Sequence, residues 1–267
     1  MRSQPICTVE NLSVTYAGTR QPALENVSLA IGANKRLAII GESGSGKSTL
    51  AKTLANLLPH GTKVSGDVIW NMQSEGGSET SSPKPGRDIA YVFQDPGASL
   101  NPVLTIGEQV AESAVHHLGM SWAKGFAHAR IMLDQVELPA YATLLNVYPH
   151  QLSGGQRQRV AIAAAISAGP KILIADEATS ALDTITQAAI VRLLDRLVQT
   201  NGMTLIFITH DIALASSLAD DIAVLKSGRL QEGGPAASIL SNPQTPYTRQ
   251  LVEAHLDLST PPLIGSM

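Results

Sequence analysis

A glycine-rich segment between a strand-like run and a helix-like run is the first part of the sequence that could do chemistry. Residues 41–48 read Gly-Glu-Ser-Gly-Ser-Gly-Lys-Ser, which is the P-loop spacing of two glycines around four residues, followed by Lys and a hydroxyl. Backbone amides in such a loop can surround phosphate oxygens, because glycine places no side chain in the way, and Lys47 adds a positive charge. The segment therefore predicts phosphate binding.

Several apolar, strand-like runs end at residues that could contribute to the same site. They end at Gly41, Gln94, Asp176 with Glu177, and Thr209 with His210. In a parallel sheet the carboxyl ends of the strands share one edge, where ligands bind. Ser48 can offer its hydroxyl to Mg²⁺, and Asp176 can complete the metal site directly or through water, since magnesium prefers oxygen ligands.

A second glycine pair lies in residues 152–156, which read Leu-Ser-Gly-Gly-Gln. Ser153 followed three residues later by Gln156 is a capping-box pattern, which predicts a helix from here toward the Gly-Pro pair at 169–170. A free helix N-terminus with two glycines is an anion site. The chain therefore carries two segments suited to phosphate.

The order of these segments resembles that of the ATP-binding subunit of an ABC transporter, and the resemblance extends from about residue 9 to about residue 252. It implies ATP and Mg²⁺ as cofactors, ATP hydrolysis as the activity, and a dimer in which the signature at 152–156 of one subunit closes over the ATP held by its partner. It also implies a D-loop in the segment Ser-Ala-Leu-Asp at 180–183, which would cross that interface at Asp183.

The resemblance assigns roles to individual residues. Glu177 would orient or deprotonate the attacking water, Gln94 would reach metal and water and sense a membrane subunit, and His210 would contact the terminal phosphate. Tyr16 would stack on adenine, although a tyrosine in a half-buried strand is ordinarily a packing residue. The metal ligands would be Ser48, Gln94 and Asp176. The nucleotide contacts would be Tyr16, Gly41, Ser43, Gly44, Ser45, Gly46, Lys47, Ser48, Thr49, Ser153, Gly154, Gly155, Gln156 and Asp183.

The elements around these residues predict an α/β fold. We expect a P-loop NTPase core with a mostly parallel sheet, an N-terminal antiparallel β region over 9–16 and 24–31, and an α-helical subdomain that carries the signature. Leucines at 50, 54, 57 and 58 fall on one helical face and predict a helix that ends at the Pro and Gly of 59–61. Residues 72–87 predict a loop. The expected domain limits are 1–94 for the first part of the core, 95–165 for the helical subdomain, 166–240 for the second part of the core, and 241–267 for a tail.

Composition agrees with this assignment. A length of 267 residues is sufficient for a sizeable core, and a net charge of −3 without a basic cluster disfavours nucleic acid as a partner. Cys7 is the single cysteine, so no internal disulfide is possible, which suits the cytosol. No run approaches the roughly 18 apolar residues of a membrane span. We therefore expect a peripheral subunit on the cytoplasmic face of the inner membrane, with the membrane part on another polypeptide.

Two less specific segments point to a branch of the family. Ser-Leu-Asn-Pro at 99–102 and Asn-Pro-Gln-Thr-Pro-Tyr-Thr at 242–248 resemble segments of peptide and nickel importers. Many peptide-importer ATPases that resemble this chain carry a longer C-terminal extension with several cysteines, and the sequence to residue 267 shows none. We therefore expect a nickel or metal-chelate importer, with a di- or oligopeptide importer as the close alternative. The implied partners are a second ATP-binding subunit, preferably a paralogue, in a head-to-tail dimer, two permeases and an extracytoplasmic substrate-binding protein.

Two other classes fit less well. A non-transport ABC ATPase acting on nucleic acid or ribosomes would normally show a second cassette, a long heptad-rich insertion or a basic arm, and the sequence has none of these. A degenerate regulatory subunit would be expected to lack Lys47, Glu177 or the signature.

The sequence departs from the family pattern at Ala178, where many ATPases that it resembles have Pro. This departure leaves the acidic pair of Asp176 and Glu177 intact.

Overall fold

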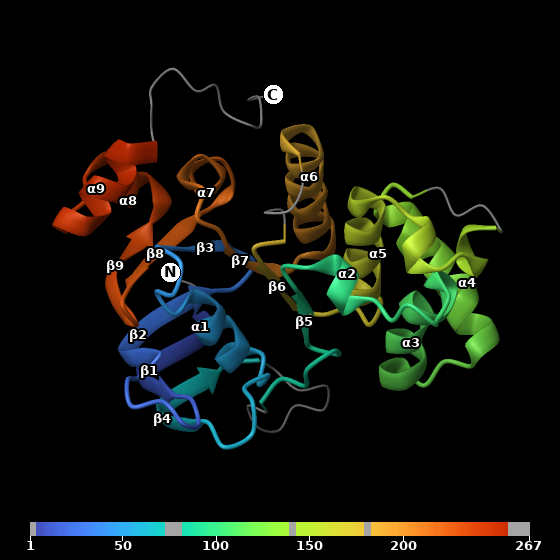
Figure 1. Ribbon diagram of the computed structural model, residues 1–267, viewed down its shortest axis with the longest axis horizontal. Helices are drawn as coiled ribbons and strands as arrows, with labels where there is room; N and C mark the ends of the chain where they lie inside the picture. The colour runs from blue at the N-terminus through green and yellow to red at the C-terminus, as the bar shows by residue number, and fades with distance from the viewer. Residues whose placement is uncertain (1–3, 73–81, 139–142, 179–182, 256–267) are drawn as a thin grey trace. The chain divides into compact units, whose positions relative to one another are not determined.

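A computed structural model describes residues 4–72, 82–138, 143–178 and 183–255 of the chain (Figure 1). It divides into two compact units, of which unit 1 comprises Met1–Pro83 with Thr204–Met267 and unit 2 comprises Lys84–Met203. Residues 180–182 of the predicted D-loop, 73–81 of the predicted loop and 256–267 of the predicted tail lie outside the described residues. The domain limits expected from the sequence stay a prediction.

Unit 1 contains an antiparallel sheet and a set of mostly parallel strands. In the antiparallel sheet, β1 (Pro5–Thr15) lies between β2 (Leu24–Gly32) and β4 (Lys63–Trp70). In the other, β3 (Arg36–Ile40) pairs in parallel with both β7 (Thr204–Ile208) and β8 (Asp221–Lys226), and β9 (Arg229–Pro235) runs antiparallel to β8. The predicted antiparallel region and parallel core are confirmed.

The core strand β3 is apolar because it is covered on both faces. Its residues 37–40 are all buried, and the same holds for the whole of β7. The helices of unit 1 are α1 (Lys47–Leu54), α7 (Ile212–Leu218), α8 (Ala236–Ser241) and α9 (Pro246–His255).

Unit 2 pairs two parallel strands, β5 (Ile89–Val92) and β6 (Ile172–Asp176), and its other elements within the described residues are helices. Helices α3 (Ile106–Leu118), α4 (Trp122–Gln135) and α5 (Gly154–Ile166) pack against one another, as Figure 1 shows in green to yellow. The unit also contains α2 (Pro96–Ser99), α6 (Thr184–Asn201) and the short 3-10 turns Leu144–Asn146 and Pro149–Gln151. None of the helices within the described part of the chain is long and apolar enough to cross a membrane.

One sequence prediction needs correction. The helix after the glycine loop ends at Leu54 and does not reach Leu57 and Leu58, because Asn56 adopts a left-handed backbone with φ 55° that no α-helix continues through. Leu57 consequently remains 38% exposed. Within the predicted tail, α9 packs against α7 and β9.

Candidate functional site

The predicted phosphate loop connects β3 to α1, and two of its glycines have no room for a side chain. A Cβ on Gly41 would clash with the carbonyl oxygen of Leu225, and one on Gly46 would lie 2.7 Å from that of Ala23. Both also have positive φ angles, of 148° and 102°. A Cβ on Gly44 would meet nothing within 4 Å, so this side of the loop opens onto free space.

Lys47 lies inside the loop with 5% of its surface exposed. Its Nζ donates hydrogen bonds to the carbonyl oxygens of Gly41, at 2.8 Å, and Glu42, at 2.9 Å. Helix α1 begins at Lys47, and its N-cap, Gly46, provides no side-chain hydrogen bond. An uncapped helix N-terminus beside a buried ammonium group and an open glycine rim fits a phosphate group.

Tyr16 lies near the same loop. Its hydroxyl is 3.1 Å from the Oγ1 of Thr49, a buried residue in the first turn of α1. The other hydroxyls of the loop differ in exposure, because Ser43 is exposed and Ser48 half-buried, while the Oγ of Ser45 is buried without a hydrogen-bond partner in the described structure. Tyr16 is therefore held against the start of α1 by a polar contact.

His210 follows β7, the parallel neighbour of β3. The amide of Thr209 donates to the carbonyl oxygen of Ile39 at 3.2 Å, so the chain leaves β7 beside the end of β3. His210 and the phosphate loop thus come from the carboxyl ends of adjacent parallel strands in unit 1, as the sequence predicts, and the His210 side chain is exposed.

Unit 2 brings Gln94, Asp176 and Glu177 to the carboxyl ends of β5 and β6, where Val92 pairs with Ala175. The Nε2 of Gln94 donates to the Oε2 of Glu177 at 2.9 Å. Glu177 is also unusual in its backbone, since its φ of 46° is a left-handed conformation that costs a non-glycine residue free energy and is typical of functional positions.

Asp176 has a partner that the sequence analysis missed. The hydroxyl of Tyr91 donates to the Oδ2 of Asp176 at 2.6 Å, and Asp176 is only 6% exposed. Tyr91 is one residue from the end of β5, and the register with β6 determines that it reaches the acid. A tyrosine near the end of the strand beside a predicted metal ligand is the only signal for it in the sequence.

The predicted signature begins α5 as expected. Ser153 is the N-cap, its Oγ accepts from the amide of Gln156 at 3.3 Å, and the Oε1 of Gln156 accepts from the amide of Ser153 at 2.9 Å. The capping box read from the sequence is confirmed. Arg157 adds a hydrogen bond from its Nη1 to the carbonyl oxygen of Leu152 at 2.7 Å.

Asp183 caps the next helix, α6, and is linked to the signature through one residue. Its Oδ1 accepts from the amides of Ile185 and Thr186, and its Oδ2 accepts from the hydroxyl of Thr186 at 2.6 Å. The hydroxyl of Thr186 holds the pKa of Asp183 below its ordinary value. A Cβ on Gly155 would lie 2.8 Å from the Cγ2 of Thr186, so signature and Asp183 meet at this threonine.

The predicted site residues thus form two groups. The phosphate loop, Tyr16, Thr49 and His210 belong to unit 1, whereas Gln94, Asp176, Glu177, the signature and Asp183 belong to unit 2. The predicted metal ligands Ser48, Gln94 and Asp176 supply a hydroxyl, an amide and a carboxylate, which is an oxygen donor set that suits Mg²⁺. The described residues contain no cluster of three or more His, Cys, Asp or Glu that could hold a metal by itself.

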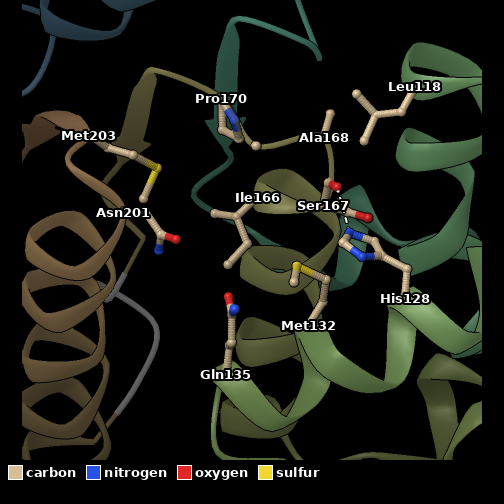
Figure 2. Close-up of a pocket in the computed structure, with 11 residues that line it drawn as sticks. Leu118, His128, Met132, Gln135, Ile166, Ser167, Ala168, Pro170, Asn201 and Met203 are labelled. Carbon is tan, nitrogen blue, oxygen red and sulfur yellow. Dashed lines mark hydrogen bonds between the residues drawn. The ribbon is translucent and has the colours of Figure 1, made fainter.

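A cavity of about 250 Å³ lies elsewhere in unit 2 and includes none of the predicted site residues (Figure 2). Its lining is mostly apolar, with Met132, Ile166 and Met203, and the Nε2 of His128 is 2.9 Å from the carbonyl oxygen of Ser167. It contains no charged side chain and is unsuited to a phosphate group.

Comparisons with known proteins agree with these features. The sequence model of the family described as "ABC transporter" matches residues 24–180. "Glutathione import ATP-binding protein GsiA" is 42% identical over 263 residues in Salmonella typhimurium and 43% identical over 260 residues in Escherichia coli K12, covering 94% and 93% of this chain. The chain spans less than half the length of these relatives, 42% in both cases.

Solved structures give the same result. A dimeric ATP-binding cassette in a post-hydrolysis state with ADP and Pi is similar with a TM-score of 0.72 and 32% identity, covering 86% of this chain and 98% of that one. The protein cbiO1 from Clostridium perfringens, part of the ABC transporter complex cbiONQ, is similar with a TM-score of 0.73 and 27% identity over 97% of both chains.

Proposed function

Because this chain belongs to the ABC transporter family, we propose that it is the ATP-hydrolysing subunit of a multi-subunit importer. The observation that carries the proposal is the phosphate loop: a buried Lys47, glycines that tolerate no side chain and an uncapped α1 form a cradle for the phosphates of ATP. Tyr16 would meet the adenine and Thr49 would support it.

Catalysis would use the residues at the ends of β5 and β6. Glu177 would act as the general base toward water, and Gln94, which already donates to it, would hold it in position. Ser48, Gln94 and Asp176 would hold Mg²⁺, which supplies charge neutralisation for phosphoryl transfer when bound. His210 would donate to the terminal phosphate.

The active form would be a head-to-tail dimer. Ser153, Gly154, Gly155 and Gln156 would close over nucleotide on the partner, and Asp183 would lie at the same interface. The related cassette solved with ADP and Pi is dimeric, which supports this arrangement. We infer that the second subunit is a paralogue and that the complex further contains two permeases and an extracytoplasmic substrate-binding protein at the inner membrane.

The substrate we propose is a small peptide. The curated relatives reported above are glutathione import proteins, and glutathione is a tripeptide. These names favour a peptide as the substrate over nickel or a metal chelate. The choice of nickel or a metal chelate stays an untested prediction from the sequence. The names of the relatives reported above describe import and transport, so they give no support to the alternative of nucleic acid or ribosomes.

The enzymatic part of the proposal is tested on the purified full chain, with binding measured on the chain alone and hydrolysis measured after its second ATP-binding subunit has been added. Wild type should bind and hydrolyse ATP in the presence of Mg²⁺, Lys47→Ala should lose nucleotide binding, and Glu177→Gln should bind ATP but hydrolyse it very slowly. A Lys47→Ala variant that binds ATP as well as wild type would contradict the assignment of the loop.

The transport part is tested by co-purification. Tagged Glu177→Gln chain, taken from detergent-solubilised native membranes with ATP and Mg²⁺, should retain two multi-span permeases and a second ATP-binding subunit, identified by mass spectrometry. Recovery of only ribosomal or DNA-associated proteins would refute the importer and favour a different ATP-driven machine.

A further inference from the structure

The segment 242–248, which resembles a segment of peptide and nickel importers, lies at the start of α9 in unit 1. Thr245 caps α9, since its Oγ1 accepts from the amide of Thr248 at 3.1 Å. The carboxylate of Glu232 in β9 accepts from the amides of Gln244, at 3.0 Å, and Thr245, at 3.2 Å. These contacts tie the start of α9 to the strand and fix the direction of the first side chains of the helix.

Tyr247, in the first turn of α9, is directed into the protein and is only 7% exposed. The Nζ of Lys226 lies 4.3 Å from the centre of its ring, within the range of a cation–π contact. Burial raises the pKa of the Tyr247 hydroxyl, so the group stays protonated and uncharged at neutral pH. A buried tyrosine hydroxyl usually has a hydrogen-bond partner.

That partner is the phosphate loop. The hydroxyl of Tyr247 accepts from the backbone amide of Glu42 at 3.2 Å. The carbonyl oxygen of the same Glu42 accepts from the Nζ of Lys47 at 2.9 Å. Both backbone polar groups of Glu42 are therefore held, one by α9 and the other by the lysine of the loop.

We propose that Tyr247 is a positioning residue that holds the phosphate loop in its binding conformation through Glu42. This inference rests on the proposed function, since it assumes that the loop binds nucleotide. Without the hydroxyl, the amide of Glu42 loses this hydrogen bond, so the loop is less ordered before nucleotide binds. Binding must then order the loop, and a single neutral hydrogen bond of this kind corresponds to an affinity loss of about three- to tenfold.

The test compares Tyr247→Phe with wild type, using the full chain and the non-hydrolysable ATP analogue AMP-PNP in isothermal titration calorimetry. Phe keeps the buried ring and its contact with Lys226 and removes only the hydroxyl. We expect the Kd to rise about three- to tenfold. In the presence of the second ATP-binding subunit, the KM for ATP should rise by the same factor and kcat should stay unchanged. If Tyr247 only stabilised the fold, Tyr247→Phe would lower the thermal midpoint of unfolding but would not raise KM while leaving kcat unchanged.

Val252→Ala is the matched control, because Val252 is buried in the same helix and its side chain has no polar atom that could bond to the loop. An unchanged Kd in Tyr247→Phe, or an equal rise in Val252→Ala, would overturn the inference. Lys47→Ala separates it from the proposed function: if wild type and Lys47→Ala both fail to bind AMP-PNP, the proposed function fails and the inference with it. If wild type binds AMP-PNP and Lys47→Ala does not, the Tyr247→Phe result tests the role of Tyr247 independently of the proposed function.

Discussion

Replacing Tyr91 by Phe removes one hydroxyl from the end of β5 and should cost the protein more stability than a typical surface substitution. The hydroxyl donates to Asp176 over 2.6 Å, and Asp176 is 6% exposed, so water cannot readily replace the lost donor. The ring itself should stay in place, because it packs 4.7 Å from the ring of Phe93 and Phe has the same shape as Tyr without the hydroxyl.

The magnitude follows from the charge of the acceptor. A hydrogen bond to a charged group contributes about 1.5–3 kcal/mol, and charge-assisted bonds are roughly twice as strong as neutral ones. Tyr16→Phe provides the neutral comparison, because the Tyr16 hydroxyl is 3.1 Å from the hydroxyl of Thr49. We therefore expect a loss of about 2 kcal/mol for Tyr91→Phe and about 1 kcal/mol for Tyr16→Phe.

Urea unfolding at pH 7, followed by circular dichroism, measures both losses. The Tyr91 variant should also be made in an Asp176→Ala background, where the hydroxyl has lost its acceptor and the cost of Tyr91→Phe should fall to about 0.5 kcal/mol or less. A cost below about 0.5 kcal/mol in the wild-type background, or an equal cost in both backgrounds, would refute the reasoning that the bond to Asp176 stabilises this end of the strand.

Three further outcomes are expected. Glu177→Gln should lower ATP turnover by at least about 100-fold while nucleotide binding persists, as for loss of a general base, and near-normal turnover would remove Glu177 from that role. The Arg36 side chain holds the pKa of Asp220 in the folded protein below its ordinary 3.8. The stability that this pair contributes is therefore complete above pH 3.8 and is lost as the pH falls through the folded-state pKa. Urea midpoints should fall less between pH 5 and pH 2 in Asp220→Asn than in wild type. Burial raises the pKa of Cys7 to about 12, so Ellman's reagent should modify the thiol only in urea, and rapid reaction of the native protein would show that β1 opens.

Local patterns allowed much of this structure to be predicted from the sequence. The capping box of Ser153 and Gln156 lies within four residues, and the apolar run of β3 leads directly into the glycine loop, so both could be read without knowledge of the fold. The end of α1 could not, since the left-handed turn at Asn56 breaks a leucine pattern that by itself extends farther.

The contacts that the site residues make with distant parts of the chain could not be predicted from local sequence patterns. Tyr91 meets Asp176 because of the register between β5 and β6, and Tyr247 meets Glu42 across 205 positions of sequence. Such contacts depend on which strands and helices become neighbours, and neither periodicity nor residue type indicates that choice. The same holds for the Thr186 contact that joins Gly155 to Asp183.

Unit 1 is formed by two segments of the chain, one before and one after unit 2, so the ribosome synthesises its last strands only after unit 2. Strand β3 pairs with β7 and β8, both of which are synthesised only after the whole of unit 2. At about 5–20 residues per second, the emerging β3 and its glycine loop wait roughly 10 to 30 seconds for these neighbours. During that interval the apolar strand β3 is exposed without its neighbouring strands. We therefore expect chaperones to bind the nascent chain, and a pause in translation between β3 and β7 to lower the yield of folded protein.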